Sequence, residues 1–258
     1  MQHMKVIKVG GKVLEEQKTF DMVVDALKQL DDPKILVHGG GNVATELAGK
    51  LGQPVKMIEG KRVTDKNMLE TVWMVYGGLR NKKLVAAMQA RGMNAMGLTG
   101  ADVNIIQAEK RPVLPVDYGL VGDIASVNTN TLSHLVQMGY IPVLAPLTHD
   151  GKGQMLNTNA DSIASEVAKA LVSHFRVELI FCFDKPGVLM DVNDETTVLH
   201  EINSESYRSM SHKGQIADGM IPKLERSFKA LHSGVNQIFI TNVFNLGKKN
   251  MQGTVVKL

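Results

Sequence analysis

Two glycine-rich segments each follow a short apolar run in this sequence. Residues 39–41 are three glycines after the run at 34–38, and residues 10–11 are two glycines after the run at 5–9. Beyond the three glycines, apolar residues recur at helical spacing, which places them where a strand turns into a helix. A helix N-terminus offers unpaired N–H groups and a positive dipole end, and glycine lets a ligand approach the backbone. The pattern predicts a site for an anion such as phosphate.

The triple glycine differs from two familiar nucleotide motifs. It lacks the GK[ST] ending of a Walker A loop. Residues 39–44, GGGNVA, do match the G-x-G-x-x-A fingerprint of dinucleotide-binding proteins, and Glu59 lies at roughly the distance of a ribose contact. The residues before Glu59 do not resemble a second parallel strand, so we disfavour a dinucleotide. A tight turn alone explains any one of these glycines but not all three.

Two lysines stand where a cation is unfavourable unless it faces an anion. Lys8 lies near the end of an apolar run, and Lys223 follows Pro222 at the start of an expected helix, where the dipole opposes a positive charge. Solvent-exposed side chains are the alternative for each. Two glycine loops at the carboxyl edge of a parallel sheet face one crevice, and with a lysine they suit a phosphoryl group in transfer.

Polar residues cluster at three further places. Asn157, Asn159 and Asp161 open an expected helix, and a single N-cap accounts for only one of them. The surplus amides suit a carboxylate or amide ligand, and the carboxylate suits the orientation of lysines. Arg62 precedes a helix that we expect Thr64 to cap, and it suits a bidentate pair with a substrate carboxylate, a surface arginine being the alternative. The polar turn at 184–188, DKPGV, is either a plain turn or a nucleotide contact.

Composition excludes several classes of protein. The chain has 258 residues, of which 44% are hydrophobic and 21% charged, and its net charge of +3 is too small to indicate nucleic-acid binding. The one cysteine, Cys182, lies in an apolar run and is expected to be buried, and the eight histidines show no metal-ligand spacing. No apolar run is long enough to span a membrane, and the start of the chain leaves no room for a signal peptide, so we expect a cytoplasmic protein.

Strand-like and helical segments alternate along the chain. The expected strands are at 5–9, 34–38, 93–99, 140–146, 177–183 and 236–242. The expected helices are at 19–30, 43–51, 66–91, 129–138, 161–172 and 222–233. Because the strands are apolar almost throughout, we predict an α/β fold with a mainly parallel sheet covered by helices on both faces. Residues 105–124 are expected to form edge hairpins, and 188–219 a strand pair, a short helix and a loop.

The motifs KVGGK, VHGGGN, GKRVTD, LNTNAD, DKPGV and IADGMIPK, in this order, resemble the amino-acid kinase superfamily and, within it, the acetylglutamate kinase family. The resemblance runs from Lys5 to the C-terminus. It implies a three-layer αβα sandwich with a mainly parallel central sheet. A lobe boundary is expected near Val172–Val177, because SHFR separates a helix from a new core strand. With that boundary, the resemblance implies an N-terminal lobe, 1–174, for acyl-amino-acid binding and dimerisation, and a C-terminal lobe, 175–258, for nucleotide binding.

The resemblance also implies roles for individual residues. Lys8 and Lys223 would flank the transferring phosphoryl group, and Asp161 would hold both lysines in place. Substrate binding would involve Gly40, Gly41, Arg62, Asn157 and Asn159. Nucleotide binding would involve Gly11, Asp184, Gly187, Val188, Leu189, Ile216 and Asp218. No protein ligand for Mg²⁺ is evident, so the phosphates of ATP would hold most of the metal's coordination shell.

The implied reaction is ATP-dependent phosphorylation of the side-chain carboxylate of an N-acyl-L-glutamate, in arginine biosynthesis. N-acetyl-L-glutamate is the favoured substrate. N-succinyl-L-glutamate and a non-catalytic amino-acid or nucleotide sensor on the same fold remain alternatives. The start KVGGKV disfavours an aspartokinase, and the pairing of RVT with NxNAD disfavours carbamate and UMP kinases.

We expect small-molecule substrates, no nucleic acid, no membrane and a homodimer. The helical region 66–91 carries a wide apolar stripe, suited to both the core and a two-fold interface: Met68, Val72, Val75, Tyr76 and Leu79. Lys8 lies so near Met1 that we expect none of the N-terminal helix by which arginine-inhibited relatives form hexamers, and therefore no inhibition by arginine.

Overall fold

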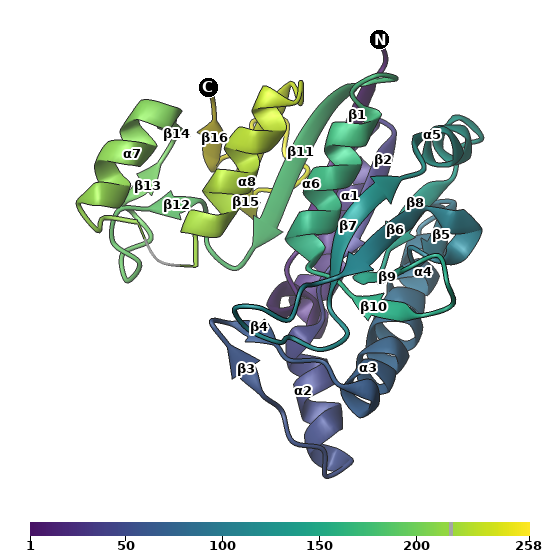
Figure 1. Cartoon of the computed structure of the whole chain (residues 1–258). Coiled ribbons are helices and arrows are strands. Elements are labelled where there is room, and N and C mark those ends of the chain that lie inside the picture. Colours follow the sequence, from purple (N-terminus) through teal and green to yellow (C-terminus); the bar gives the residue numbers. More distant parts are fainter. Residues whose placement is uncertain (217–218) are drawn as a thin grey trace. The chain divides into compact units, whose positions relative to one another are not determined.

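The computed structural model describes residues 1–216 and 219–258. The chain forms two compact units (Figure 1): a terminal unit of residues 1–34 and 164–258, and an inserted unit of residues 35–163. The predicted division into lobes 1–174 and 175–258 stays a prediction.

The terminal unit contains five neighbouring strands of a mainly parallel sheet. In spatial order they are β14 (Glu201–Ile202), β16 (Thr254–Val256), β15 (Gln237–Asn242), β11 (Arg176–Phe183) and β1 (His3–Val9). Only the pair β15–β16 is antiparallel. The three longest strands are apolar and largely buried, as strands covered on both faces must be.

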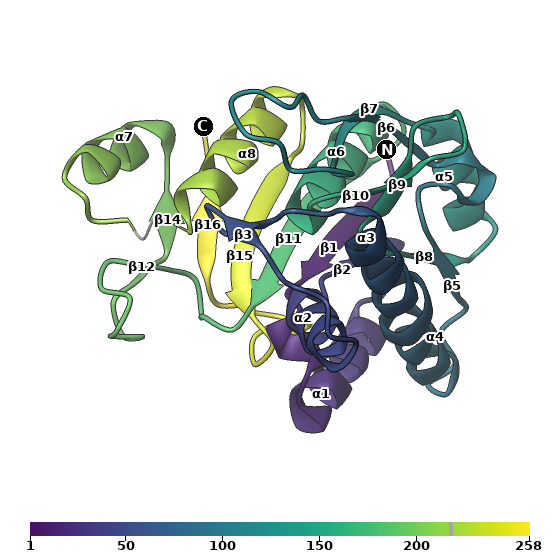
Figure 2. The ribbon, with the colours of Figure 1, turned by 60° about the horizontal axis from the view of Figure 1, so that its bottom comes forward.

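Helices cover this sheet on both faces. Figures 1 and 2 show α6 (Ala160–Leu171) and α8 (Ile221–His232) over one face and α1 (Gln17–Gln29) on the other. Helix α1 buries Phe20, Val23, Val24 and Leu27, which recur at helical spacing. The remaining elements are a 3₁₀ turn (Lys12–Leu14), the hairpin β12 (Val188–Leu189) and β13 (Val198–Leu199), and α7 (Ser204–His212).

The inserted unit contains three parallel strands and a second, mostly antiparallel sheet. The parallel strands are, in order, β2 (Lys34–His38), β8 (Ile141–Leu144) and β5 (Ala95–Leu98). The second sheet has the order β10 (Met155–Asn157), β9 (Leu147–His149), β6 (Ile106–Lys110) and β7 (Gly122–Val127). A small hairpin pairs β3 (Met57–Ile58) with β4 (Lys61–Arg62).

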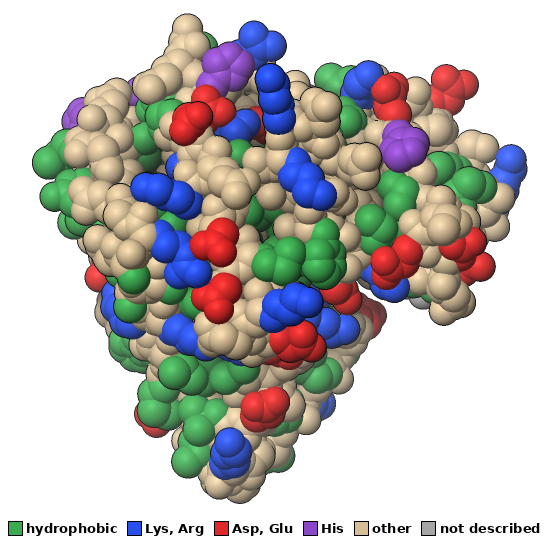
Figure 3. Space-filling view, turned by 180° about the vertical axis from the view of Figure 1, so that it is seen from behind, with side chains coloured by type: hydrophobic (Ala, Val, Ile, Leu, Met, Phe, Trp, Pro, Cys, Tyr) green, Lys and Arg blue, Asp and Glu red, His purple; other side chains and the backbone are tan. Residues whose placement is uncertain are grey.

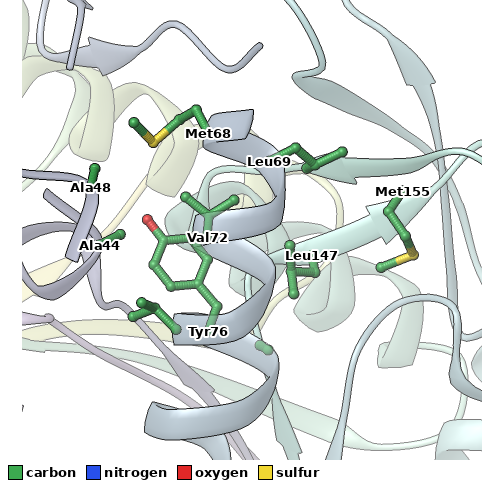
Figure 4. Close-up of a cluster of buried hydrophobic side chains, with 10 residues drawn as sticks. Ala44, Ala48, Met68, Leu69, Val72, Tyr76, Leu147 and Met155 are labelled. Atoms are coloured by element: carbon green, nitrogen blue, oxygen red, sulfur yellow. The ribbon is translucent and has the colours of Figure 1, made fainter. Parts of the chain in front are cut away.

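Some helices of the inserted unit contribute to an apolar core cluster. The helical elements of this unit are α2 (Gly41–Lys50), α3 (Lys66–Trp73), a π-helical segment (Met74–Arg80), α4 (Asn81–Gln89), a 3₁₀ turn (Asp102–Asn104) and α5 (Thr129–Gln137). In Figure 4, Ala44 and Ala48 of α2 lie on one side of α3, and Leu147 of β9 and Met155 of β10 lie on its other side. Four members of the predicted stripe, Met68, Val72, Val75 and Tyr76, belong to this core, whereas Leu79 is 57% exposed.

The six predicted strands and six predicted helices are confirmed to within two residues at each end. The predicted α/β class with a mainly parallel sheet is also confirmed. A π-helical segment interrupts the predicted helix 66–91 at Gly77 and Gly78. Strands β9 and β10 were not predicted, because three residues are too few to show a period.

The face of the molecule shown in Figure 3 carries no single dominant charge. On this face, Lys and Arg side chains are interspersed with Asp and Glu, in keeping with the net charge of +3. Among the helices described, none is both long enough and apolar enough to cross a membrane.

Candidate functional site

The triple glycine lies at the N-terminus of α2, as predicted. Gly40 is the N-cap residue, and as a glycine it has no side chain to cap the helix. A Cβ on Gly40 would lie 3.1 Å from Cδ1 of Tyr76, so the ring leaves little room for a side chain. A Cβ on Gly41 would meet no heavy atom within 4 Å. The first turn of α2 therefore begins with a close-packed, buried glycine followed by an exposed one.

Arg62 reaches this first turn from a distant part of the chain. Its Nη2 atom donates hydrogen bonds to Gly41 O at 2.9 Å and to Thr45 Oγ1 at 2.7 Å. Its Nη1 atom has a weaker sulfur contact, 3.7 Å from Sδ of Met68. The Arg62 side chain is 8% exposed, so its charge lies in a partly desolvated place, where a carboxylate ligand would be favoured.

Tyr76 lies beside this arginine. Burial raises the pKa of the Tyr76 hydroxyl, and the charge of Arg62 and a hydrogen bond to it oppose that shift. The structure thus groups Arg62, Tyr76, Gly40 and Gly41.

Asn157 is joined to the same neighbourhood through Thr64. The Asn157 Nδ2 atom donates to Thr64 Oγ1 at 3.0 Å. The prediction that Thr64 caps α3 was wrong, because Oδ1 of Asp65 accepts the N–H of Met68 at 2.8 Å and Asp65 is the N-cap. An aspartate carboxylate is a strong acceptor for this N–H group, and Thr64 is left to contact the asparagine.

Residues 118–120 connect Thr64 and Asn157 and were not among the predicted site residues. Thr64 N donates to Tyr118 O, Leu120 N donates to Thr64 O, and Asn157 N donates to Leu120 O, all between 2.7 and 2.9 Å. Gly119 has a φ of +73°, and a Cβ there would lie 2.3 Å from Thr64 O. Only glycine fits at this position beside the carbonyl of Thr64, and this glycine was the one sign of the contact in the sequence.

Asn159 and Asp161 lie at the start of α6. Asn159 Oδ1 accepts the N–H of Ser162 at 3.0 Å, which makes Asn159 the helix cap. Asp161 is in the first turn and is 5% exposed. The cap explains Asn159 structurally, whereas a carboxylate as buried as that of Asp161 requires a specific partner.

In the terminal unit, both predicted lysines lie near the carboxyl end of β11. Lys8 of β1 is in register with Phe181 of β11. The Lys223 Nζ atom is 6.0 Å from the centre of the Phe183 ring, at the end of the same strand. Cys182, between them, is fully buried, and burial raises the pKa of its thiol to about 12, opposed by the nearby charge of Lys8. A thiol with that pKa is not a nucleophile at neutral pH.

Most of the residues assigned to the nucleotide follow the end of β1 or β11. Gly11 precedes the 3₁₀ turn, and Lys12 lies 3.9 Å from the exposed carboxylate of Asp184. Val188 N donates to Thr254 Oγ1 at 2.8 Å, and a Cβ on Gly187 would lie 2.6 Å from that hydroxyl oxygen.

A cavity of about 40 Å³ adjoins this turn. Its lining includes Gly187, Val188, Leu189 and Met220. Ile216 is 4% exposed, and Asp218 lies outside the described residues. In residues 1–216 and 219–258, no group of three His, Cys, Asp or Glu side chains is placed to hold a metal ion.

His38 lies directly before the triple glycine and is completely buried. Its Nδ1 atom is 3.1 Å from Gly39 O, and its Nε2 atom is 3.3 Å from Nδ2 of Asn81. Burial lowers the pKa of His38 to about 4; the bond to Gly39 opposes this shift, and the charge of Arg80 adds to it. His38 is therefore neutral near pH 7.

The lowered pKa of His38 predicts a loss of stability in acid. Between pH 6.5 and 4, the unfolded chain binds a proton at His38 that the folded chain does not bind, so the free energy of unfolding falls as pH falls. A pKa lowered from 6.5 to about 4 corresponds to a loss of about 2 kcal/mol from pH 7 to pH 5. Urea unfolding at both pH values should show that His38→Asn removes this part of the dependence. The exposed His212→Asn is the control, and an unchanged pH dependence in His38→Asn would contradict the prediction.

The comparisons with known proteins agree with one another. The amino acid kinase family matches residues 3–242. Acetylglutamate kinase of Phocaeicola vulgatus is 51% identical over 256 residues, 99% of each chain, and that of Parabacteroides distasonis is 52% identical over 241 residues, 93% of this chain and 94% of the relative. Among solved structures, smu.665 from Streptococcus mutans UA159 has a TM-score of 0.81 at 29% identity and 98% coverage of both chains.

Proposed function

Because the chain belongs to the amino acid kinase family, we propose that it uses ATP to phosphorylate the side-chain carboxylate of an N-acyl-L-glutamate, with N-acetyl-L-glutamate as the favoured substrate, in arginine biosynthesis. The relatives named acetylglutamate kinase, at about half identity over nearly the whole chain, support this substrate. The observation that carries the proposal is Arg62, a nearly buried guanidinium on the first turn of α2 beside the triple glycine. Together, Arg62 and the triple glycine offer a dicarboxylate one cation and the N–H groups of a helix N-terminus.

The substrate is assigned to the inserted unit. Arg62 binds one carboxylate of the acyl-glutamate through its Nη1 edge, where only the weak sulfur contact has to be displaced. Asn157 donates or accepts hydrogen bonds at the amide of the acyl group, and Asn159 lies beside it. Gly40 and Gly41 direct N–H groups at the accepting carboxylate, which attacks as an oxyanion and needs no general base.

The phosphoryl group passes from ATP to that carboxylate. A carboxylate oxygen forms a bond to the γ-phosphorus while the bond from this phosphorus to the bridging oxygen breaks, and ADP leaves. Two anions approach each other in this step, so cations must stabilise the transition state. We assign this role to Lys8 and Lys223, with Asp161 as the orienting carboxylate.

ATP is assigned to residues of the C-terminal lobe, 175–258, together with Gly11. Its contacts are Asp184, Gly187, Val188, Leu189, Ile216 and Asp218. A Mg²⁺ ion would take its ligands mainly from the phosphates, and it would supply further positive charge. We also propose a cytoplasmic location, since ATP and amino-acid precursors are available there.

Release of ADP tests the substrate. With ATP and Mg²⁺, N-acetyl-L-glutamate, N-succinyl-L-glutamate and free L-glutamate are compared by kcat/KM in a coupled assay. The proposal predicts the highest value for N-acetyl-L-glutamate. A higher value for the succinyl compound would reassign the acyl group, and no ADP above background with any of the three would favour a sensor.

We further propose a homodimer, with residues 1–174 supplying its interface. Three exposed apolar side chains of the region 66–91 support this assembly. Leu79 of the predicted stripe is 57% exposed, and Trp73 and Met74, which are outside the stripe, are 47% and 53% exposed. Trp73 and Met74 line an open cavity of about 650 Å³ that also borders α4 and β5. Large apolar side chains exposed around a concavity are typical of an interface.

Light scattering should give twice the mass of one chain. Trp73→Asp should shift the protein toward a monomer, because it places a charge in the apolar interface. Leu51→Asp is the matched control, since Leu51 is also about half exposed, at 51%, and lies at the end of α2. A monomeric wild-type protein, or equal effects of the two changes, would contradict this assembly.

A further inference from the structure

A buried polar chain within the inserted unit leads from β8 to the triple glycine. Asn81, the first residue of α4, donates from Nδ2 to Val143 O at 2.8 Å. The same nitrogen lies 3.3 Å from Nε2 of His38, and His38 Nδ1 lies 3.1 Å from Gly39 O. Asn81 is 1% exposed and His38 is completely buried, so water does not compete for these contacts.

The contacts fix both the orientation of the amide and the tautomer of the ring. A carbonyl oxygen only accepts hydrogen bonds, so the group facing Val143 O must be the amide nitrogen of Asn81. Its second hydrogen then points at Nε2 of His38, which must be the unprotonated ring nitrogen. The proton of the neutral imidazole is therefore on Nδ1, which donates it to Gly39 O.

Gly97 of β5 is the third residue of this arrangement, because its lack of a side chain makes room for the amide of Asn81. A Cβ on Gly97 would lie 1.9 Å from Oδ1 of Asn81, a distance that two such atoms cannot share. The amide thus has one position, set by a missing side chain on one side and by the carbonyl of Val143 on the other.

The bond to Gly39 O determines the direction of the next N–H group. A peptide group is planar and trans, so the N–H of Gly40 points opposite to the C=O of Gly39. Because His38 holds that carbonyl toward the buried interior, the Gly40 N–H is directed away from it. A hydrogen bond to a peptide oxygen also polarises the group and strengthens its N–H as a donor.

We propose that His38 and Asn81 are positioning residues that act through the Gly39–Gly40 peptide: the Nδ1–H of His38, in the tautomer that Asn81 selects, aims the Gly40 N–H at the reacting anion. This inference rests on the proposed function, which assigns Gly40 to the accepting carboxylate. His38 itself touches neither the substrate nor the phosphates. Its effect is on kcat, since an N–H group aimed at developing charge counts most in the transition state.

Two substitutions of His38 separate positioning from packing. In His38→Asn the side-chain amide nitrogen takes the place of Nδ1 and keeps a donor to Gly39 O. In His38→Gln the amide reaches the place of Nε2, and that donor is lost. We expect His38→Asn to keep kcat within about threefold of wild type and His38→Gln to lower it at least tenfold, with smaller changes in the KM for ATP. Equal kcat values in the two variants would overturn the proposal.

The role of Asn81 is tested by making Asn81→Ala both in the wild type and in the His38→Asn variant. Asn81→Ala should lower kcat in the wild type, where it removes the group that selects the tautomer. It should have little further effect in His38→Asn, whose amide needs no such selection. The exposed Lys83→Ala is the control on the same helix. An equal loss from Asn81→Ala in both backgrounds would show a packing role and overturn the proposal.

A measurement on the wild-type protein tests the tautomer of His38 directly. It remains possible if His38→Gln or Asn81→Ala fails to fold, and it does not depend on activity. Long-range ¹H–¹⁵N correlation spectra of ¹⁵N-histidine-labelled protein report which ring nitrogen of each histidine carries the proton. The signals of His38 are assigned by their loss in His38→Asn, and they are expected to show a ring protonated on Nδ1. An Nε2-protonated ring would overturn the inference. Absence of kinase activity in the wild type would instead overturn the proposed function alone.

Discussion

Lys8→Ala and Lys223→Ala are each expected to lower kcat by about a thousandfold, with a much smaller change in the KM for ATP. Each change removes a cation from beside a phosphoryl group whose charge is most concentrated in the transition state, and loss of one such electrostatic contact costs about a hundred- to a thousandfold. Both lysines lie near the carboxyl end of β11 and are partly buried, so their ammonium groups are only partly screened by water.

Steady-state kinetics with saturating N-acetyl-L-glutamate measures this effect. Lys229→Ala is the matched control, because Lys229 lies on the exposed side of α8, on the same helix as Lys223. A kcat in either catalytic variant within threefold of the Lys229→Ala value would remove that lysine from the reaction.

Arg62→Lys is expected to raise the KM for N-acetyl-L-glutamate about tenfold or more, with the KM for ATP nearly unchanged. Lysine keeps the charge but cannot form a planar bidentate pair with a carboxylate. It also loses the paired bonds to Gly41 O and Thr45 Oγ1, so the first turn of α2 is held less firmly. Arg208→Lys on α7, in the terminal unit, is the control. A change confined to the KM for ATP would assign Arg62 to the nucleotide instead.

Local patterns in the sequence predicted most of the fold. The apolar runs and the helical spacing identified six strands and six helices, because each element is long enough to show its period. Strands β9 and β10 have three residues each and show none. The division into two compact units could not be predicted either. The first 34 residues belong with residues 164–258 because β1 pairs with β11, and no local pattern reveals that strand pairing.

Residues of the candidate site could be predicted where their type is rarely found at such a position in the sequence. Three glycines before a helix, and an arginine that proves to be nearly buried, belong to this class. The contacts of residues 118–120 with Thr64 and Asn157 depend on backbone bonds between distant segments, so they needed the structure. The same holds for Asn81, which looks like an ordinary helix residue and yet selects the tautomer of His38.

Trapping of the product tests the proposed reaction most directly. An acyl phosphate reacts with hydroxylamine to give a hydroxamate, and mass spectrometry locates the hydroxamate on the substrate. With ATP, Mg²⁺ and N-acetyl-L-glutamate, we expect a hydroxamate at the side-chain carboxylate, formed together with an equal amount of ADP and strongly reduced in Lys8→Ala. ATP hydrolysis without a hydroxamate, or no turnover of either substrate by the folded wild-type protein, would contradict a carboxylate kinase.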